Sequence, residues 1–155
     1  AREEARIKNE YIGKLLDKVA ATSKVDVPFS MIATEVKNRI SEMEQQLSAQ
    51  GIGMDMYLQM TGMDRAKLES QIAPMAAGKV KVDLILEAIA KAENIEVSED
   101  EVTAKMTEVA KYYGMDLAKL EEELNKHKNY DNFKYTIKGE CVMQKAIDLL
   151  VETAK

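Results

Sequence analysis

The stretch from residue 74 to residue 101 constrains the fold most strongly, because its first part carries apolar residues on more than one side of a helix. One apolar stripe at helical spacing consists of Val82, Ile85, Leu86 and Ile89, and a second consists of Val80, Leu84 and Ala88. A helix with two apolar stripes needs neighbours on both of them. We therefore expect this helix to be central.

The same stretch ends this helix at Asn94, continues through a short extended piece at residues 95–97, and starts another helix at Ser98. Glu101 follows Ser98 by three residues, which is the spacing of a capping box. The two prolines, Pro28 and Pro74, stand where helices are expected to begin. No segment alternates apolar and polar residues at period two with β-branched enrichment. The sequence therefore predicts an all-α protein.

Composition favours one soluble globular domain. A chain of 155 residues is long enough to bury a sizeable core, and 46% apolar with 32% charged residues is typical of that class. No apolar run approaches the roughly 18 residues of a membrane span. The net charge of −5 and the lack of a dense Lys/Arg cluster argue against nucleic acid as a partner. The chain starts at Ala1 and is helical from the outset, so we expect a piece of a longer protein.

Apolar spacing predicts further helices over about residues 2–22, 28–50, 54–61, 64–72, 99–113, 117–126 and 132–153. We expect Pro74 to force a kink or a restart before the central helix. In the helix at 99–113, Val102, Met106, Val109 and Tyr113 are expected on one face.

The tripeptide Gly-Met-Asp occurs at residues 53–55, 62–64 and 114–116. In each, glycine suits the left-handed position that closes one helix, and aspartate suits the cap of the next. We expect tight corners between helices at all three.

Catalytic chemistry finds little support. His127 stands between two lysines in a polar tract, and Cys141 lies in an apolar segment that favours a small buried side chain. One Cys and one His make a zinc site improbable, and the glycines stand apart rather than in a phosphate-binding loop. We expect no enzyme, no metal and no cofactor.

Methionine is the unusual feature, with ten Met against two Phe and no Trp. Met75, Met106 and Met143 lie on apolar stripes and are expected in the core. Five others gather at the corners, namely Met54, Met56, Met60, Met63 and Met115. Their flexible, polarizable side chains suit a surface that accepts many partner shapes.

The order and spacing of several short segments carry a resemblance to a known family. These segments are Val25-Asp26-Val27-Pro28 leading into Met31-Ile32 and Glu35, Tyr57-Leu58 before Thr61-Gly62, residues 80–90, residues 93–98, Tyr113-Gly114, and residues 146–151. Together they resemble the C-terminal domain of trigger factor, the bacterial ribosome-associated chaperone, over nearly the whole chain. The capping segment after Ile95 is also similar to SurA-like and PrsA-like chaperones, which are the nearest alternatives.

The resemblance implies an elongated helical body with two protruding arms that bind unfolded or nascent polypeptides without ATP. On that template, residues 1–24 form a connecting helix, 28–72 the first arm, 74–97 the central helix and link, 98–127 the second arm, and 131–155 a body helix. The expected client-binding residues are Met43, Leu47, Ile52, Met54, Met56, Tyr57, Met60, Met63, Tyr112 and Met115. The ribosome-docking and peptidyl-prolyl isomerase domains of the family have no counterpart here.

The resemblance further implies a cytoplasmic location and a ribosome contact only through a missing domain. Weak self-association remains open. An oligomerisation module with one specific partner remains open as an alternative, as does a helical enzyme with a deep polar pocket.

Overall fold

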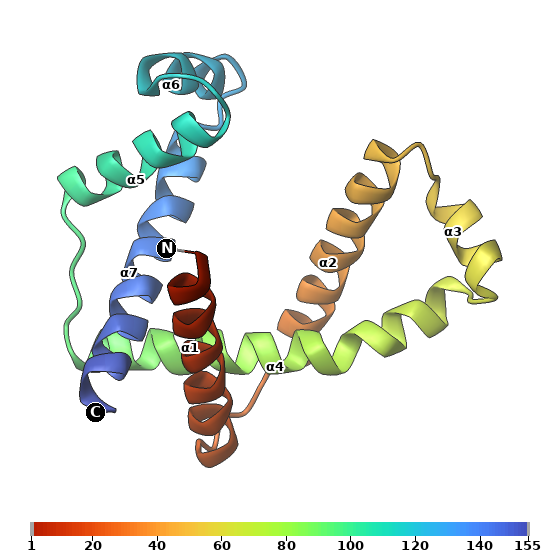
Figure 1. Ribbon diagram of the computed structural model, residues 1–155, viewed down its shortest axis with the longest axis horizontal. Coiled ribbons are helices and arrows are strands. Elements are labelled where there is room, and N and C mark those ends of the chain that lie inside the picture. The colour runs from red at the N-terminus through yellow and green to blue at the C-terminus, as the bar shows by residue number, and fades with distance from the viewer. Residues whose placement is uncertain (1, 155) are drawn as a thin grey trace. The chain divides into compact units, whose positions relative to one another are not determined.

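The computed structural model describes residues 2–154, and these residues form helices joined by short connections (Figure 1). The helices are α1 (Arg2–Thr22), α2 (Phe29–Ala49), α3 (Met54–Thr61), α4 (Arg65–Ala92), α5 (Glu99–Tyr112), α6 (Leu117–Lys126) and α7 (Tyr130–Thr153). No strand occurs within residues 2–154, which confirms the all-α prediction. Residues 1 and 155, the outer ends of the expected connecting and body helices, lie outside the described part.

Helix α4 corrects part of one prediction, because it is continuous through Pro74 and does not restart there. A proline inside a helix removes one backbone hydrogen bond and costs roughly 3 kcal/mol. Packing offsets this cost, since Ile72, Ala73 and the fully buried Ala76 flank the proline in an apolar cluster. Tertiary contacts therefore outweigh the tendency of proline to end an isolated helix.

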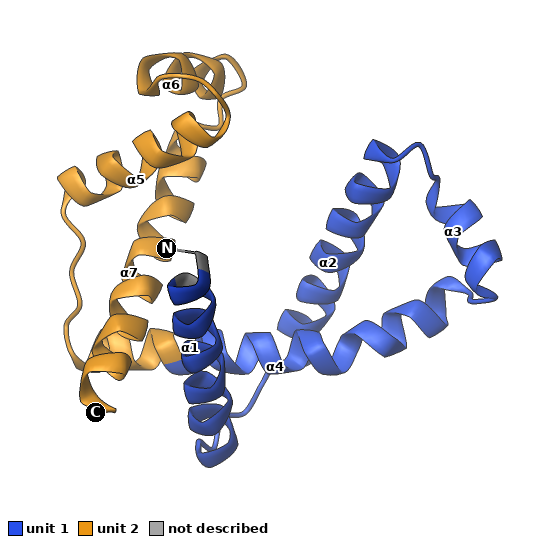
Figure 2. Cartoon of the chain, in the orientation of Figure 1, with its two compact units in different colours: residues 1–85 blue, residues 86–155 orange. Residues whose placement is uncertain are grey.

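The chain divides into two compact units, one of residues 1–85 and one of residues 86–155 (Figure 2). The boundary falls inside α4, between Ile85 and Leu86. The residues expected to form the first arm all lie in unit 1, and those expected to form the second arm all lie in unit 2. Each unit is described separately below.

The core of unit 1 is small and lies where α2, α3 and α4 meet. Its buried members are Val36, Ile40 and Ala76, with Ile32, Met54, Ile72 and Ala73 packed against them. Two ion pairs join α2 to α4: Arg65 lies 3.7 Å from Glu44, and Lys79 lies 3.5 Å from Glu35. These partly exposed pairs add little free energy, so the apolar contacts hold the unit together.

Unit 2 has its own core, built mainly by α5 and α7 together with the link before α5. Val97, Val102, Met106 and Ile137 are buried there, and Val109, Leu117, Tyr130, Phe133, Cys141 and Val142 pack against them. Burial raises the pKa of the Cys141 thiol, so this side chain is a poor nucleophile at neutral pH. Its place beside the core agrees with the interpretation of a small apolar residue.

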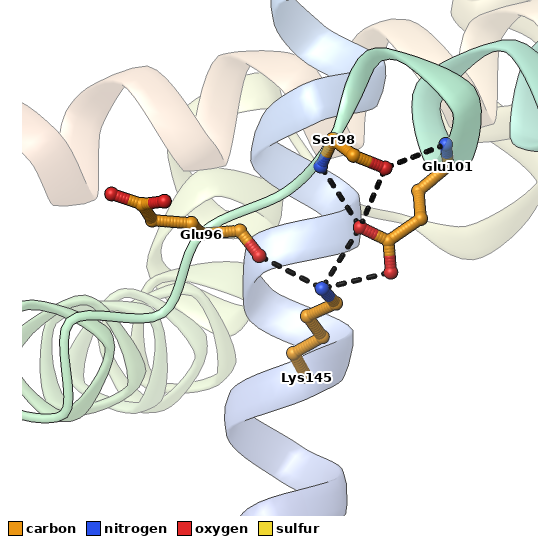
Figure 3. A network of polar contacts seen from close by, with 4 residues as sticks. All are labelled: Glu96, Ser98, Glu101 and Lys145. Carbon is orange, nitrogen blue, oxygen red and sulfur yellow. Dashed lines mark hydrogen bonds and ion pairs between the residues drawn. The ribbon is translucent and has the colours of Figure 1, made fainter.

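The link between α4 and α5 is fastened by a polar network centred on Lys145 (Figure 3). The expected capping box is present: the Ser98 hydroxyl accepts a hydrogen bond from the Glu101 backbone N–H at 3.3 Å, and the Ser98 N–H donates to Glu101 Oε2 at 2.9 Å. Lys145 Nζ on α7 donates to the Glu96 carbonyl at 2.8 Å and pairs with Glu101 Oε1 at 2.8 Å. One ammonium group thus joins the link, the start of α5 and α7.

Five helices end in the same way, with a residue at positive φ and two backbone hydrogen bonds that point back into the last turn. The positive-φ residues are Gly51, Gly62, Asn94, Gly114 and Lys128. In α3, for example, the Met63 N–H donates to the Leu58 carbonyl and the Gly62 N–H to the Gln59 carbonyl. This is the Schellman motif, which satisfies carbonyls that the helix leaves free.

Corners between helices lie at all three tripeptides, and the predicted roles of the glycine and the aspartate hold at two of them. Asp64 and Asp116 cap α4 and α6, accepting from the N–H groups of Lys67 and Lys119 at 2.7 and 2.8 Å. The tripeptide at 53–55 was assigned wrongly, because Gly51 already closes α2 and Gly53 is itself the extended N-cap residue of α3. Asp55 therefore lies inside the first turn of α3 rather than before it.

Two glycines of unit 2 provide a matched test of this backbone analysis. A Cβ atom at Gly114 or at Gly139 would meet nothing within 4 Å, so only backbone conformation distinguishes them. Gly114 has φ +70°, where alanine is strained by about 1 kcal/mol, whereas Gly139 is helical, where alanine gains roughly 0.5–1 kcal/mol. Urea unfolding should show Gly114→Ala destabilised and Gly139→Ala stabilised; effects of the same sign would contradict the assignment.

The Lys145 network predicts a pH-dependent contribution to stability. The hydrogen bond from Lys145 holds the pKa of Glu101 below its ordinary value, so the contribution is complete above the ordinary pKa of a glutamate and is lost as pH falls through the lowered one. Unfolding of wild type and Lys145→Met, followed from pH 7 into acid, should show a stability difference that shrinks in that range. Lys14→Met, on an exposed lysine without an ion pair in the described residues, should give a difference that does not change with pH.

Candidate functional site

Large apolar side chains are exposed on three helices of unit 1 outside α1. They are Phe29 (83% exposed) and Met31 (39%) on α2, Met56 (54%) and Met60 (75%) on α3, and Met75 (60%) on α4. We call these five residues the unit 1 apolar set. These residues are dispersed over separate helices and do not line one deep pocket together.

Helix α3 explains why some of this surface stays uncovered. It has eight residues and none of them is buried. A helix with apolar residues on all sides and so few residues contributes only Met54 to the core cluster. The rest of its apolar surface therefore faces outward, with Met56 and Met60 as its most exposed members.

A hollow of about 380 Å³ lies between α2 and α4 within unit 1. Its lining consists of Phe29, Ile32, Ala33, Val36 and Lys37 from α2, and Ala66, Glu69, Ser70 and Ala73 from α4. Phe29 stands seven residues before Val36, so the two lie on one helical face. The apolar stripe that builds the core of unit 1 thus continues into the hollow, where it is no longer covered.

Unit 2 exposes aromatic rather than aliphatic side chains. Tyr112, Tyr113 and Tyr135 are all largely exposed, and the rings of Tyr112 and Tyr113 meet edge to face at 5.5 Å between centroids. Tyr113 was expected on the buried face with Val102 and Met106, which is wrong. It is the C-cap of α5, where the chain leaves the helix and the periodicity no longer applies.

The residues predicted to bind clients divide by exposure. Three are exposed, namely Met56, Met60 and Tyr112, and seven are half-buried, namely Met43, Leu47, Ile52, Met54, Tyr57, Met63 and Met115. Ile52, Met63 and Met115 each follow a left-handed glycine directly, where an apolar side chain usually packs back on the last helical turn. Their half-buried state thus has a local structural reason. Client binding by the ten residues stays a prediction.

Sequence reasoning missed several exposed groups. Met75 was expected in the core and is 60% exposed; its neighbour Ala76 is the fully buried residue of that turn. Phe29 and Met31, at the start of α2, are both exposed but were not among the residues predicted to bind clients. Tyr135 stands between Lys134 and Thr136, and this polar setting was a usable signal of exposure.

The described residues contain no group of three or more His, Cys, Asp or Glu side chains arranged to hold a metal ion. Helices of sufficient length and hydropathy to span a bilayer are also lacking over residues 2–154. The surface features of both units are therefore apolar and aromatic patches between ion-paired side chains.

Comparison with known proteins shows which sequences this chain resembles. The trigger factor of Fusobacterium nucleatum is 51% identical over 99% of this chain, and those of Bacillus thuringiensis and Bacillus cereus are 40% identical over 95% of it. The matched region is 36% of the first protein and 34% of the others, so the chain spans about a third of the length of these curated relatives.

A solved structure of trigger factor domains from Thermotoga maritima matches the fold with a TM-score of 0.65 at 17% identity, covering 96% of this chain and 83% of that one. The family described as bacterial trigger factor protein (TF) C-terminus matches residues 1–152. This match favours trigger factor over the SurA-like and PrsA-like alternatives. The chain therefore belongs to the trigger factor C-terminal family.

Proposed function

We propose that this chain is the client-binding part of an ATP-independent chaperone, and that it holds unfolded or nascent polypeptides through dispersed apolar side chains. The observation that carries the proposal is the unit 1 apolar set. Its five large side chains lie on α2, α3 and α4 beside a small core that they do not join. Exposed apolar surface of this kind marks a site of interaction.

The side chains of the set suit clients of varied sequence. Four of the five are methionines, whose unbranched chains adapt to differently shaped apolar groups. Each contact is weak, and several contacts along one client raise the overall affinity without a tight site. Release then needs only the successive loss of weak contacts, which fits a chaperone that uses no nucleotide.

Charged residues between the apolar side chains keep such a surface hydrated. Many are paired along one helix, as in Arg39 with Glu35 at 3.1 Å and Lys79 with Asp83 at 2.8 Å. Pairs at this spacing stabilise helices modestly and leave no large field of one sign on that surface. We infer that these pairs support solubility of the unliganded surface.

The proposal assigns no catalytic role to these residues. Peptidyl-prolyl isomerase activity and ribosome docking are attributed to other parts of a full-length trigger factor, and the expected location is the cytoplasm. The competing interpretation is an oligomerisation module whose exposed apolar set binds a copy of itself. Sedimentation over a range of concentrations separates the two, because such a module forms a discrete oligomer of fixed size.

Replacing exposed methionines should weaken chaperone action without unfolding the chain. Met56→Ser with Met60→Ser removes two of the most exposed apolar groups of α3, and neither is buried in the core of unit 1. We expect the concentration needed to suppress aggregation of a chemically unfolded client to rise severalfold, measured by light scattering. The midpoint of thermal unfolding should stay close to that of wild type.

Gln59→Ser provides the matched control, since Gln59 is an exposed polar residue of the same helix. It should leave aggregation suppression unchanged. Equal suppression by wild type and the double methionine variant would refute the role given to α3, whereas loss of suppression with both variants would indicate damage to the helix itself.

A further inference from the structure

Charge is distributed unequally between the two units. Residues 1–85 contain 12 Lys or Arg and 12 Asp or Glu, which gives a net charge of zero. Residues 86–155 contain 10 and 15, which gives −5 and accounts for the whole net charge of the chain. Unit 1 is therefore the part of the molecule that a negatively charged segment approaches without net repulsion.

Within unit 1, the hollow between α2 and α4 has one unbalanced charge in its lining, that of Lys37. The other charged lining residue, Glu69, lies 3.6 Å from Arg65 on the same helix, and this pair neutralises it. Lys37 is exposed, and its side chain forms no ion pair or hydrogen bond with another residue in the described part of the chain. An exposed lysine with an unpaired side chain thus lines an otherwise largely apolar hollow.

The first turn of α2 also contributes partial positive charge near the hollow. It contains no acidic residue, and its N-cap is Pro28, which offers no side-chain acceptor to the free N–H groups. Phe29, the first residue of that helix, lines the hollow. The partial positive charge of this helix start is confined to the first turn, so it acts at the Phe29 end of the hollow, eight residues before Lys37.

Size limits what the hollow admits. About 380 Å³ lies at the low end of the roughly 300–1,000 Å³ found for ligand pockets, so it takes a few side chains of an extended or helical segment and not a folded surface. The apolar walls favour a large aliphatic or aromatic side chain. A neighbouring carboxylate would then reach Lys37 at the rim.

We propose that this hollow selects client segments in which a large apolar residue stands next to, or two positions from, Asp or Glu. The inference rests on the proposed function, because it names the class of client segment that one part of the chaperone surface prefers. The free charge of Lys37 beside an apolar lining supports it. A lysine or arginine at the same place in the client would meet like charge.

Labelled peptides test this selectivity on the whole chain. Three short peptides share one apolar centre and carry Asp, Lys or Ser beside it, and fluorescence anisotropy gives their dissociation constants. We expect the Asp peptide to bind about threefold to tenfold more tightly than the Lys peptide in low salt, since one exposed attraction replaces one repulsion. The difference should shrink as salt screens the pair.

Two pairs of variants locate the effect. Lys37→Glu should reverse the preference, whereas Lys14→Glu, which makes the same change of net charge on α1 away from the hollow lining, should retain it. Ala66→Trp fills the hollow from an exposed position and should weaken binding of the Asp peptide severalfold. Ala118→Trp, on the exposed surface of α6, should not.

The outcomes separate the inference from the function on which it rests. Equal affinities for the Asp and Lys peptides, or equal effects of the two lysine variants, overturn the selectivity. If the Ser peptide still binds and aggregation suppression persists in those cases, the chaperone function stands. Failure of all three peptides to bind, together with no suppression of aggregation, overturns both.

Discussion

The structure depends on a helix that carries buried side chains in several directions near its centre. Val80, Ile85 and Leu86 of α4 are each at most 8% exposed. At about 100° per residue their side chains point in three directions that are spaced by roughly 100° to 140° around the axis. Such a segment is stable only with packing on more than one side, and the boundary between the two compact units falls within it.

The cores of the two units are built in different ways. Unit 1 combines a few aliphatic contacts with two weak ion pairs and leaves long apolar side chains uncovered. Unit 2 encloses Val102 and Met106 more completely and fastens its entry link through Lys145. The difference suits a division in which one unit presents adaptable aliphatic surface and the other presents tyrosine rings with a net negative charge.

The sequence predicted the helices well because their signals are local. Apolar spacing, the Ser98 capping box and the left-handed glycines each depend on residues within one or two turns, and each was found where expected except at Gly53. Errors arose where distant packing decides. Pro74 is tolerated because Ala76 is buried, and Met75 is exposed because no partner covers its side of α4.

The same distinction applies to the candidate site. Met56 and Met60 could be foreseen as exposed, because a short helix with apolar residues on all sides cannot cover them. The hollow between α2 and α4 could not, since it brings together residues about 40 positions apart in the sequence, as Phe29 and Ser70 illustrate. The free charge of Lys37 likewise becomes visible only once the position of every possible partner is known.

The shared form of the helix ends has a consequence for the thermodynamics of the proposed client binding. Backbone hydrogen bonds within the last turn close five helices, so those ends are fixed without help from distant contacts. Helices closed in this way are already ordered before any segment arrives. The conformational entropy lost on association then falls mainly on the client chain, and the affinity for a flexible polypeptide depends on how much freedom that polypeptide gives up.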